Sequence, residues 1–196
     1  MPTHRLFIAI TLPAPLLDTL TGVQQRLQRQ LARYPLRWVR PEGIHLTLKF
    51  LGETDAARID DLKHALQAVA THYTAFELSV GGLGMFPHAR RPSVLWVGVQ
   101  DEQHRLQKLA ADIDKAVAGL GWKPEKKPFT GHLTLARVKR QASNPQRRAL
   151  GQQVAGLRGY ARVGVLPVQR VCIMRSQLRA GGAVYTEVAC VTLNQS

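Results

Sequence analysis

Apolar positions recur along the chain at two spacings, and each spacing predicts a kind of secondary structure. Residues three and four positions apart share one face of a helix, so apolar residues at these steps predict amphipathic helices. Such stretches lie at residues 16–31, 59–69, 106–120 and 146–157. Thr54 is the expected cap of the second helix, and Asn144 followed by Pro145 is the expected start of the fourth.

Shorter apolar and β-branched runs separate these helices and predict strands. The expected strands cover residues 6–11, 44–51, 76–80, 94–99, 168–174 and 184–193, and one more begins near His132. A loop at 81–92 and a hairpin turn at 179–182 are expected from their Gly and Pro content or polarity. Strands joined by short turns, with helices between them, predict an α+β protein with mostly antiparallel sheets. No linker divides the chain, so residues 1–196 are expected to form one domain of two related, intertwined lobes.

The tetrapeptide His-Leu-Thr-Leu occurs twice, at residues 45–48 and 132–135, and each copy begins a predicted strand. Successive side chains of a strand point to opposite faces. Each histidine therefore shares a face with the threonine two residues later, while the leucines point the other way. A fold that brings the two strands together would place two imidazoles and two hydroxyls across one cleft.

The alternative is that this repeat has no function. A short repeat of ordinary strand residues arises easily by chance, and a lone histidine in a strand is usually structural. Three features favour function: both copies contain histidine, both begin a strand, and both are flanked by arginine and lysine.

Composition and charge narrow the class of partner. The chain has 196 residues, of which 45% are hydrophobic, as in ordinary globular proteins. It carries 27 lysines and arginines against 13 acidic residues, a net charge of +14, which favours a polyanion such as nucleic acid over the alternative of a merely solubilising surface. The basic residues that flank the motifs and an intervening loop are Arg33, Arg37, Arg40, Arg90, Arg91, Lys123, Lys126, Lys127, Arg137, Lys139 and Arg140.

Two further patterns concern location and redox state. No apolar run approaches the ~20 residues that cross a bilayer, and the first residues do not resemble a signal peptide, so we expect a cytoplasmic protein without membrane contact. Cys172 and Cys190 lack the spacing of metal ligands, and we expect them to be small buried residues in strands. The alternative that they face each other across the C-terminal hairpin stays open.

The paired motifs suit chemistry on a phosphodiester. Such a reaction needs a base to take a proton from the nucleophile and an acid to protonate the leaving oxygen, and histidine serves both roles because its ordinary pKa is about 6.5. Threonine hydroxyls can donate to the non-bridging oxygens, where charge accumulates in the transition state. Each His-x-Thr unit therefore offers one proton carrier and one oxyanion donor.

The segments 45–52 and 132–137 resemble the paired signatures of the 2H phosphoesterase superfamily. Within it, the chain is most similar to the RNA 2′,3′-cyclic phosphodiesterases, also called 2′-5′ RNA ligases. The similarity covers nearly the whole chain and includes residues 5–10, 84–87, 94–98, 176–178 and 185. One position departs from the family pattern, because Gly131 stands where proline usually precedes the second histidine.

The resemblance implies a bilobal, pseudo-twofold fold in which sheets line a central basic cleft and helices lie outside. It implies hydrolysis of RNA 2′,3′-cyclic phosphate ends to 2′-phosphomonoesters without a metal or other cofactor, and in several members reversible 2′-5′ ligation. By analogy, His45 is the proton donor to the departing 3′ oxygen and His132 is the proton acceptor that activates water. Thr47 and Thr134 hold the phosphate. The expected ligands are RNA ends or cyclic nucleotides, bound by a monomer with no obligate protein partner.

The same resemblance implies that Phe50 and Arg137 hold the terminal base between a ring and a guanidinium plane. Strict alternation places both residues on the face opposite the histidines, so this role requires an irregularity in each strand. The alternative puts Phe50 in the core and makes Arg137 an ordinary surface charge.

Two other functions compete with the leading one. A non-catalytic basic RNA-binding module would show the same salt-sensitive binding, so only turnover separates it from an enzyme. A metal site on the two histidines is less favoured, because no carboxylate or cysteine lies at ligand spacing beside either motif.

Overall fold

The computed structural model of the protein describes residues 2–180 and 182–195. Its strands are β1 (Thr3–Thr11), β2 (Leu36–Trp38), β3 (His45–Asp55), β4 (Phe76–Phe86), β5 (Val94–Gln100), β6 (His132–Val138), β7 (Gly164–Val168), β8 (Arg170–Arg179) and β9 (Gly182–Thr192). Its α-helices are α1 (Ala14–Gln30), α2 (Ile59–Ala70), α3 (Arg105–Gly119) and α4 (Asn144–Gly156). Short 3₁₀ turns at Pro41–Gly43 and Ala56–Arg58 precede β3 and α2. In this described part of the chain, no helix is both long and apolar enough to cross a membrane.

The strands form one sheet in the order β7-β4-β5-β6-β3-β1-β8-β9, with β2 added beside β6. All pairings between these strands are antiparallel, which confirms the predicted α+β class. The two halves of the sheet meet between β6 and β3 through a single residue pair, Leu46 and Leu133. The order is symmetric about this junction, since β3 and β6, then β1 and β5, then β8 and β4 occupy matching places. The predicted pseudo-twofold arrangement is therefore confirmed.

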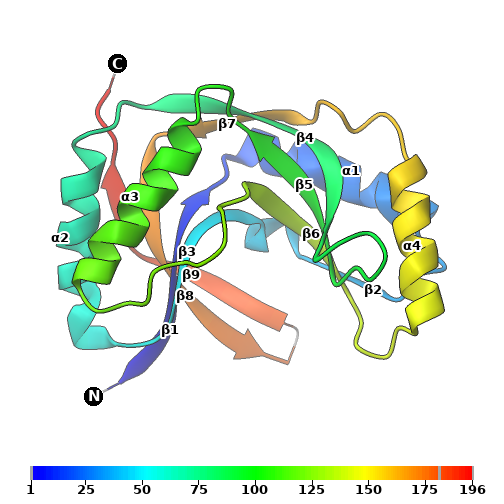
Figure 1. Cartoon of the computed structure of the whole chain (residues 1–196), viewed down its shortest axis with the longest axis horizontal. Helices are drawn as coiled ribbons and strands as arrows, with labels where there is room; N and C mark the ends of the chain where they lie inside the picture. Colours follow the sequence, from blue (N-terminus) through cyan, green and yellow to red (C-terminus); the bar gives the residue numbers. More distant parts are fainter. Residues whose placement is uncertain (1, 181, 196) are drawn as a thin grey trace.

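Each half of the sheet carries two helices, and together they form a lobe (Figure 1). In lobe A, which contains β1, β3, β8 and β9, α2 and α3 pack together, with α2 against β8 and β9 and α3 against β3. In lobe B, which contains β4, β5, β6 and β7, α1 packs against β7 and α4 against β4. Strand β1 of lobe A leads into α1 of lobe B, and β5 of lobe B leads into α3 of lobe A. Each lobe is thus built from both halves of the chain.

The main hydrophobic core lies between the helices and one face of the sheet. Helix α1 contributes Leu16, Leu20, Val23 and Leu27, which is the stripe that its spacing predicts. Burying one such side chain contributes about 1.5–3 kcal/mol. All four leucines of the two His-Leu-Thr-Leu motifs also belong to this core, so both strands are anchored with their histidines on the opposite face. We call that opposite face the motif face.

Several predicted boundaries are wrong. Strand β4 continues to Phe86, because the segment expected to be a loop at 81–92 pairs with β5 over its first half. The short strands β2 and β7 were not expected from the sequence. Strand 168–174 is divided, since Val168 ends β7 and Arg170 begins β8. Strand β2 has three residues, too few to show an alternation, and β7 contains a glycine and a proline, which do not favour a strand.

Two expected helix starts differ from the prediction. Thr54 is buried inside β3 and does not cap α2, which follows a 3₁₀ turn that is itself capped by the Asp55 carboxylate, an acceptor from Ala57 N at 3.0 Å. At α4, Ser143 rather than Asn144 is the cap, and it forms a reciprocal capping box with Gln146.

The expectation for the two cysteines is right in part: both lie in strands and Cys172 is buried, but Cys190 is partly exposed and the two are joined. Cys172 and Cys190 are directly paired across β8 and β9 and form a disulfide. The alternative that they face each other across the C-terminal hairpin is therefore correct. The predicted hairpin is present, with Arg179 opposite Gly182, although residue 181 of the predicted turn lies outside the described residues.

Candidate active site

The two His-x-Thr units lie at the junction of the lobes. Leu46 and Leu133 are antiparallel partners, so the same register places His45 beside Thr134 and Thr47 beside His132. All four of these side chains are partly exposed, whereas the intervening leucines are buried. The predicted alternation is present in both strands, and it gathers two imidazoles and two hydroxyls on the motif face.

Both imidazoles are oriented in the same way by the backbone. His45 Nδ1 lies 2.8 Å from the carbonyl oxygen of Gly43, and His132 Nδ1 lies 2.8 Å from that of Thr130. A carbonyl oxygen only accepts, so each Nδ1 carries a hydrogen and donates it. When the ring is neutral, Nε2 is therefore the basic nitrogen, and it remains available to a ligand.

Burial and positive charge lower the pKa of both histidines. For His45 the pKa falls from 6.5 to about 4, mainly because burial disfavours the charged ring, with further contributions from the positive charges of Arg137 and His132. The pKa of His132 is also lowered, first by burial and then by Arg137. In each case the carbonyl that accepts from Nδ1 acts in the opposite direction. Arg137 thus lies within electrostatic range of both imidazoles, where an anion would be attracted.

Aromatic side chains surround each histidine. In lobe A, the His45 ring centroid lies 4.7 Å from Phe7 and 4.8 Å from Tyr185. In lobe B, His132 lies 4.8 Å from Phe86, edge to face, and 6.1 Å from Trp96. All four aromatic residues lie in segments that carry the family resemblance, but the sequence alone predicts no contact between them and the histidines. Phe7 is also hard to assign to one face of β1, because both faces of that strand are apolar.

A β-bulge occurs at the same place in each motif strand. Thr47 pairs with Ala9 while Lys49 pairs with Ile8, so Leu48 is an extra residue. Likewise Leu135 is extra in β6, because the residues on either side of it pair with consecutive residues of β5. An extra residue reverses the face of the residues that follow it, which in β3 extends to Phe50, since a second irregularity occurs at Leu51. A base-binding role for Phe50 and Arg137 requires an irregularity in each strand, and these bulges provide it.

The bulges turn Phe50 and Arg137 onto the motif face. Phe50 pairs with Phe7, which contacts His45, and its side chain is 64% exposed. The alternative that Phe50 belongs to the core is therefore wrong. Arg137 is exposed at the matching position of β6. The two residues occupy equivalent positions on either side of the pseudo-twofold junction.

Lys49 is turned the other way by the same bulge. Its buried Nζ lies 2.5 Å from Asp114 Oδ1 on α3 and donates to the carbonyl oxygen of Lys123 at 2.7 Å. This basic residue of the first motif is therefore structural, because it fastens β3 to α3. Its counterpart in β6 is the small buried Ala136.

Gly131, the departure from the family pattern, lies against β5. Its carbonyl oxygen accepts a hydrogen bond from Val99 N at 3.0 Å, and an added Cβ would come within 2.9 Å of the Val99 carbonyl oxygen. The glycine thus permits a close approach that ties the residue before His132 to the sheet.

In the part of the chain that the structure describes, neither motif histidine gathers with two other possible metal ligands. Among the described residues, the one group that brings three metal-ligating atoms together is Cys172, Glu187 and Cys190, and two of its members are joined in the disulfide. Neither histidine of the motifs belongs to such a group.

The symmetric sheet and the two His-x-Thr strands at its centre are the features of the 2H phosphoesterase class. The chain belongs to the family described as LigT like Phosphoesterase, whose model matches it twice, over residues 10–96 and 97–185. The two matches agree with the two repeats that the fold displays.

Curated relatives and solved structures cover nearly the whole chain. It is 30% identical to the RNA 2′,3′-cyclic phosphodiesterase of Methanothermobacter thermautotrophicus, over 94% of this chain and 96% of the relative. It is 32% identical to the RNA 2′,3′-cyclic phosphodiesterase of Aquifex aeolicus, over 87% and 89%. The structure of TT0787 of Thermus thermophilus has a TM-score of 0.80 and 26% identity, covering 97% of this chain and 98% of that one. E. coli LigT complexed with 3′-AMP has the same fold, with a TM-score of 0.78 and 23% identity over 99% and 100%.

Proposed function

We propose that this protein hydrolyses the 2′,3′-cyclic phosphate ends of RNA to 2′-phosphomonoesters, with His45 as general acid and His132 as general base. The observation that carries the proposal is the pair of imidazoles at the lobe junction, each with Nδ1 held by a carbonyl and Nε2 free. Acid and base must act on the same phosphate, and this junction offers one of each from equivalent strands. The names of the curated relatives support the choice of substrate.

The reaction requires one bond to form and one to break at phosphorus. His132 Nε2 takes a proton from water, and the water oxygen attacks the phosphorus. The bond from phosphorus to the 3′ oxygen breaks, and His45 Nε2 donates a proton to that oxygen. Thr47 and Thr134 donate hydrogen bonds to the non-bridging oxygens, where transition-state charge accumulates. The products are a 2′-phosphate and a 3′-hydroxyl.

The ionisation of the site supports this scheme once an anion is bound. In the free protein both histidines are held neutral by burial and by Arg137. A cyclic phosphate carries a negative charge, so binding it between the rings favours the protonated form of either one. One shared proton then suffices, with the protonated ring as acid and the neutral ring as base.

The terminal base would stack between Phe50 and Arg137. Both side chains are exposed on the motif face after equivalent bulges, and a ring with a guanidinium plane is a common way to hold an unpaired base.

If a 5′-hydroxyl of a second RNA replaced water, the same proton transfers would form a 2′-5′ linkage. The monomeric state, the cytoplasmic location and the absence of a cofactor stay predictions.

Turnover of a 2′,3′-cyclic-phosphate oligonucleotide tests this function. We expect hydrolysis to continue in EDTA, and we expect His45→Ala and His132→Ala each to lower kcat at least ~10²-fold, the lower range for acid–base catalysis. His64→Ala, on the exposed face of α2, is the matched control and should retain activity. Loss of activity in EDTA, or survival of activity in both variants, would contradict the mechanism. RNA binding without any turnover would favour the non-catalytic module instead.

A further inference from the structure

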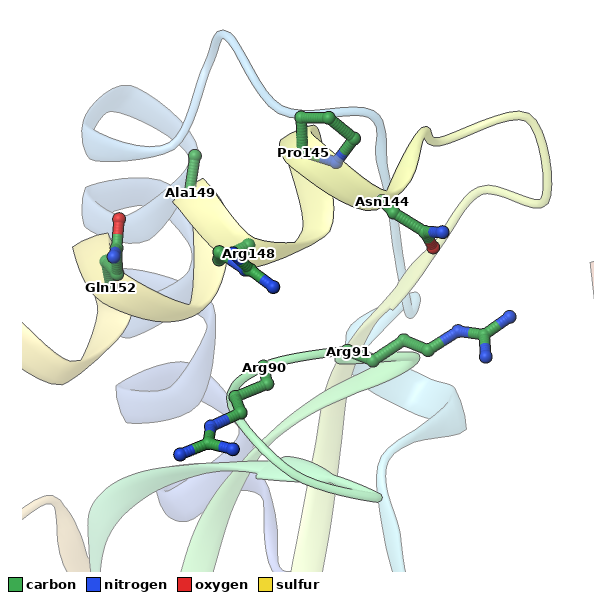
Figure 2. Close-up of a pocket in the computed structure, with 7 residues that line it drawn as sticks. All are labelled: Arg90, Arg91, Asn144, Pro145, Arg148, Ala149 and Gln152. Carbon is green, nitrogen blue, oxygen red and sulfur yellow. The ribbon is translucent and has the colours of Figure 1, made fainter.

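A second polar site lies in lobe B, between the β4–β5 loop and helix α4 (Figure 2). It is a hollow of about 550 Å³ lined by Arg90 and Arg91 of the loop and by Arg148 of the helix. In Figure 2 the Arg148 side chain extends toward the loop, whereas those of Arg90 and Arg91 extend outward from the loop. Asn144 and Gln152 on α4 add amide groups to the lining. An adjoining hollow of about 410 Å³ shares Arg90, Arg148 and Gln152 and extends the site along the helix. We call the two hollows together the α4 groove.

The side chains of the three arginines of the α4 groove make no polar contact that would stabilise the described part of the fold. Among residues 2–180 and 182–195, no ion pair or side-chain hydrogen bond involves Arg90, Arg91 or Arg148, and all three are exposed. Their neighbour Arg147 is used differently, since it donates to the carbonyl oxygens of Pro92 at 2.6 Å and Lys139 at 3.1 Å. The structural arginine is thus paired, while three positive charges remain free for a ligand.

The loop that carries Arg90 and Arg91 is packed against α4. Gly151 of α4 packs directly on the loop, because an added Cβ there would come within 1.8 Å of the carbonyl oxygen of Ala89. The contacts of Arg147 hold the other end of the same loop against α4. A docked loop loses less conformational freedom on binding than a mobile one, which favours binding of an anion.

Charge is divided unevenly between the lobes. The sequence contains no aspartate or glutamate at residues 78–100 or 126–186, and these two segments build most of lobe B and both sides of the α4 groove. Helices α2 and α3 of lobe A, by contrast, carry Asp60, Asp61, Asp112 and Asp114. These four carboxylates offset the four basic residues of the same helices, Lys63, Arg105, Lys108 and Lys115, whereas the positive charge of the two segments of lobe B is not offset. A polyanion that reaches the lobe junction is therefore attracted more strongly to lobe B.

The α4 groove begins close to the proposed active site. Phe86, whose ring contacts His132, is the last residue of β4, and Arg90 follows four residues later. The Cα atoms of these two residues are thus at most about 14 Å apart. Arg137 is paired with Val94 at the other end of the same loop. A short stretch of nucleotides can span this distance.

We propose that the α4 groove binds the sugar-phosphate backbone of single-stranded RNA, a few nucleotides on the 5′ side of the cyclic phosphate. This inference rests on the proposed function and names its substrate as an oligonucleotide rather than a free cyclic nucleotide. The guanidinium groups contact phosphates, and the amides of Asn144 and Gln152 contact sugar or phosphate oxygens. Such contacts read no base, so the preference is for chain length and not for sequence.

Paired variants and paired substrates test the proposal. The groove variant R90Q/R91Q/R148Q and the control K63Q/K108Q/K115Q, on exposed lysines of α2 and α3, remove the same charge from opposite lobes. We expect the groove variant to lower kcat/KM for a cyclic-phosphate oligonucleotide about tenfold, through KM, since three phosphate contacts are lost. Its kcat/KM for 2′,3′-cyclic CMP should change less than about twofold. The control should change neither. Equal losses on both substrates, or an equal loss in the control, would overturn the α4 groove as a site and leave hydrolysis intact.

A binding measurement keeps the proposal testable if the protein hydrolyses neither substrate, an outcome that refutes the proposed function alone. RNA with an ordinary 3′-hydroxyl is titrated by fluorescence anisotropy across a range of salt concentrations. Each phosphate contact contributes about 0.7 to the slope of log K against log salt for single strands, so the groove variant should lose about 2. The same slope in the wild type, the control and the groove variant would refute the α4 groove.

Discussion

At the scale of single residues, the two nitrogens of each imidazole have different partners: Nδ1 contacts the backbone, and Nε2 is left for the ligand. Nδ1 donates to a carbonyl two residues earlier in the chain, at 2.8 Å for both His45 and His132. That contact fixes the ring and the tautomer, while burial and Arg137 lower the pKa and so disfavour a charged ring. In the free protein both imidazoles are thus neutral and lie close to a positive charge. The negative charge of a bound phosphate raises their pKa and so favours the protonated form of one ring.

The pH dependence of hydrolysis follows from the direction of these shifts. Because kcat/KM reports the free enzyme, its pH profile should be bell-shaped with a centre below 6.5, the ordinary pKa of histidine. The kcat profile should lie at higher pH, since the bound anion raises the pKa of the rings. Arg137→Gln removes a positive charge and should move the kcat/KM profile toward higher pH. A profile centred above 6.5, or one that Arg137→Gln moves toward lower pH, would contradict this account.

At the scale of secondary structure, the two bulges decide which side chains meet the ligand. A regular strand would bury Phe50 and Arg137 and expose Lys49 with the histidines. The extra residues at Leu48 and Leu135 reverse this arrangement in both strands. The lysine then joins an ion pair under the sheet, and the two base-binding candidates lie beside the histidines.

Removing the Phe50 ring should weaken binding of the terminal base. Stacking on an aromatic side chain contributes ~1–3 kcal/mol per base, so we expect Phe50→Ala to raise KM about five- to one-hundred-fold. Phe50→Tyr keeps the ring and should retain KM. Since Phe50 is 64% exposed, thermal unfolding should change little. An unchanged KM in Phe50→Ala would show that the base lies elsewhere.

Removing the charge of Lys49 should weaken the packing of β3 on α3. Lys49→Met leaves Asp114 without its buried partner, and we expect a loss of about 3 kcal/mol, the lower end for breaking such a pair because Asp114 is partly exposed. Lys63→Met, at an exposed position of α2, should change stability by less than about 0.5 kcal/mol. Urea unfolding of both variants provides the comparison. A Lys49→Met protein as stable as the wild type would mean that the ion pair does not fasten the strand.

The sequence predicts elements with a clear period and misses features that depend on register. The four helices follow from stripes such as Leu16, Leu20, Val23 and Leu27, and the faces of the two motifs follow from alternation. Bulges leave no such pattern, because one extra residue is invisible until the partner strand is known. The same holds for the pairing of Cys172 with Cys190, which is a property of the β8–β9 register. The aromatic neighbours of the histidines come from distant strands and were likewise not predicted.

At the scale of the whole molecule, both lobes contribute to the site, and each lobe contains a helix that directly follows a strand of the other lobe. The sheet halves meet through one residue pair, yet α1 and α3 each cross to the lobe opposite the strand that precedes them. Neither lobe could then bury its core without the other half of the chain. We propose on this basis that residues 1–196 form a single domain.

A single domain should unfold in one step. Trp96 lies in lobe B, and Trp122 lies in lobe A with its Nε1 donating to the Leu51 carbonyl oxygen at 3.2 Å. The third tryptophan, Trp38, lies in β2 of lobe B. Variants that keep only Trp96 or only Trp122 of the three should give the same urea midpoint by fluorescence, because the lobes depend on each other. Different midpoints for the two reporters would indicate lobes that unfold separately.

The terminal phosphate formed from a 2′,3′-cyclic-phosphate oligonucleotide is the most direct test of the central claim. Phosphorus NMR of the product distinguishes a 2′-phosphate from a 3′-phosphate. Our account predicts only the 2′-phosphate, because His45 protonates the 3′ oxygen while His132 activates water. A 3′-phosphate product would contradict the proposed orientation of the ester between the two histidines, and an unreacted cyclic phosphate would contradict the function itself.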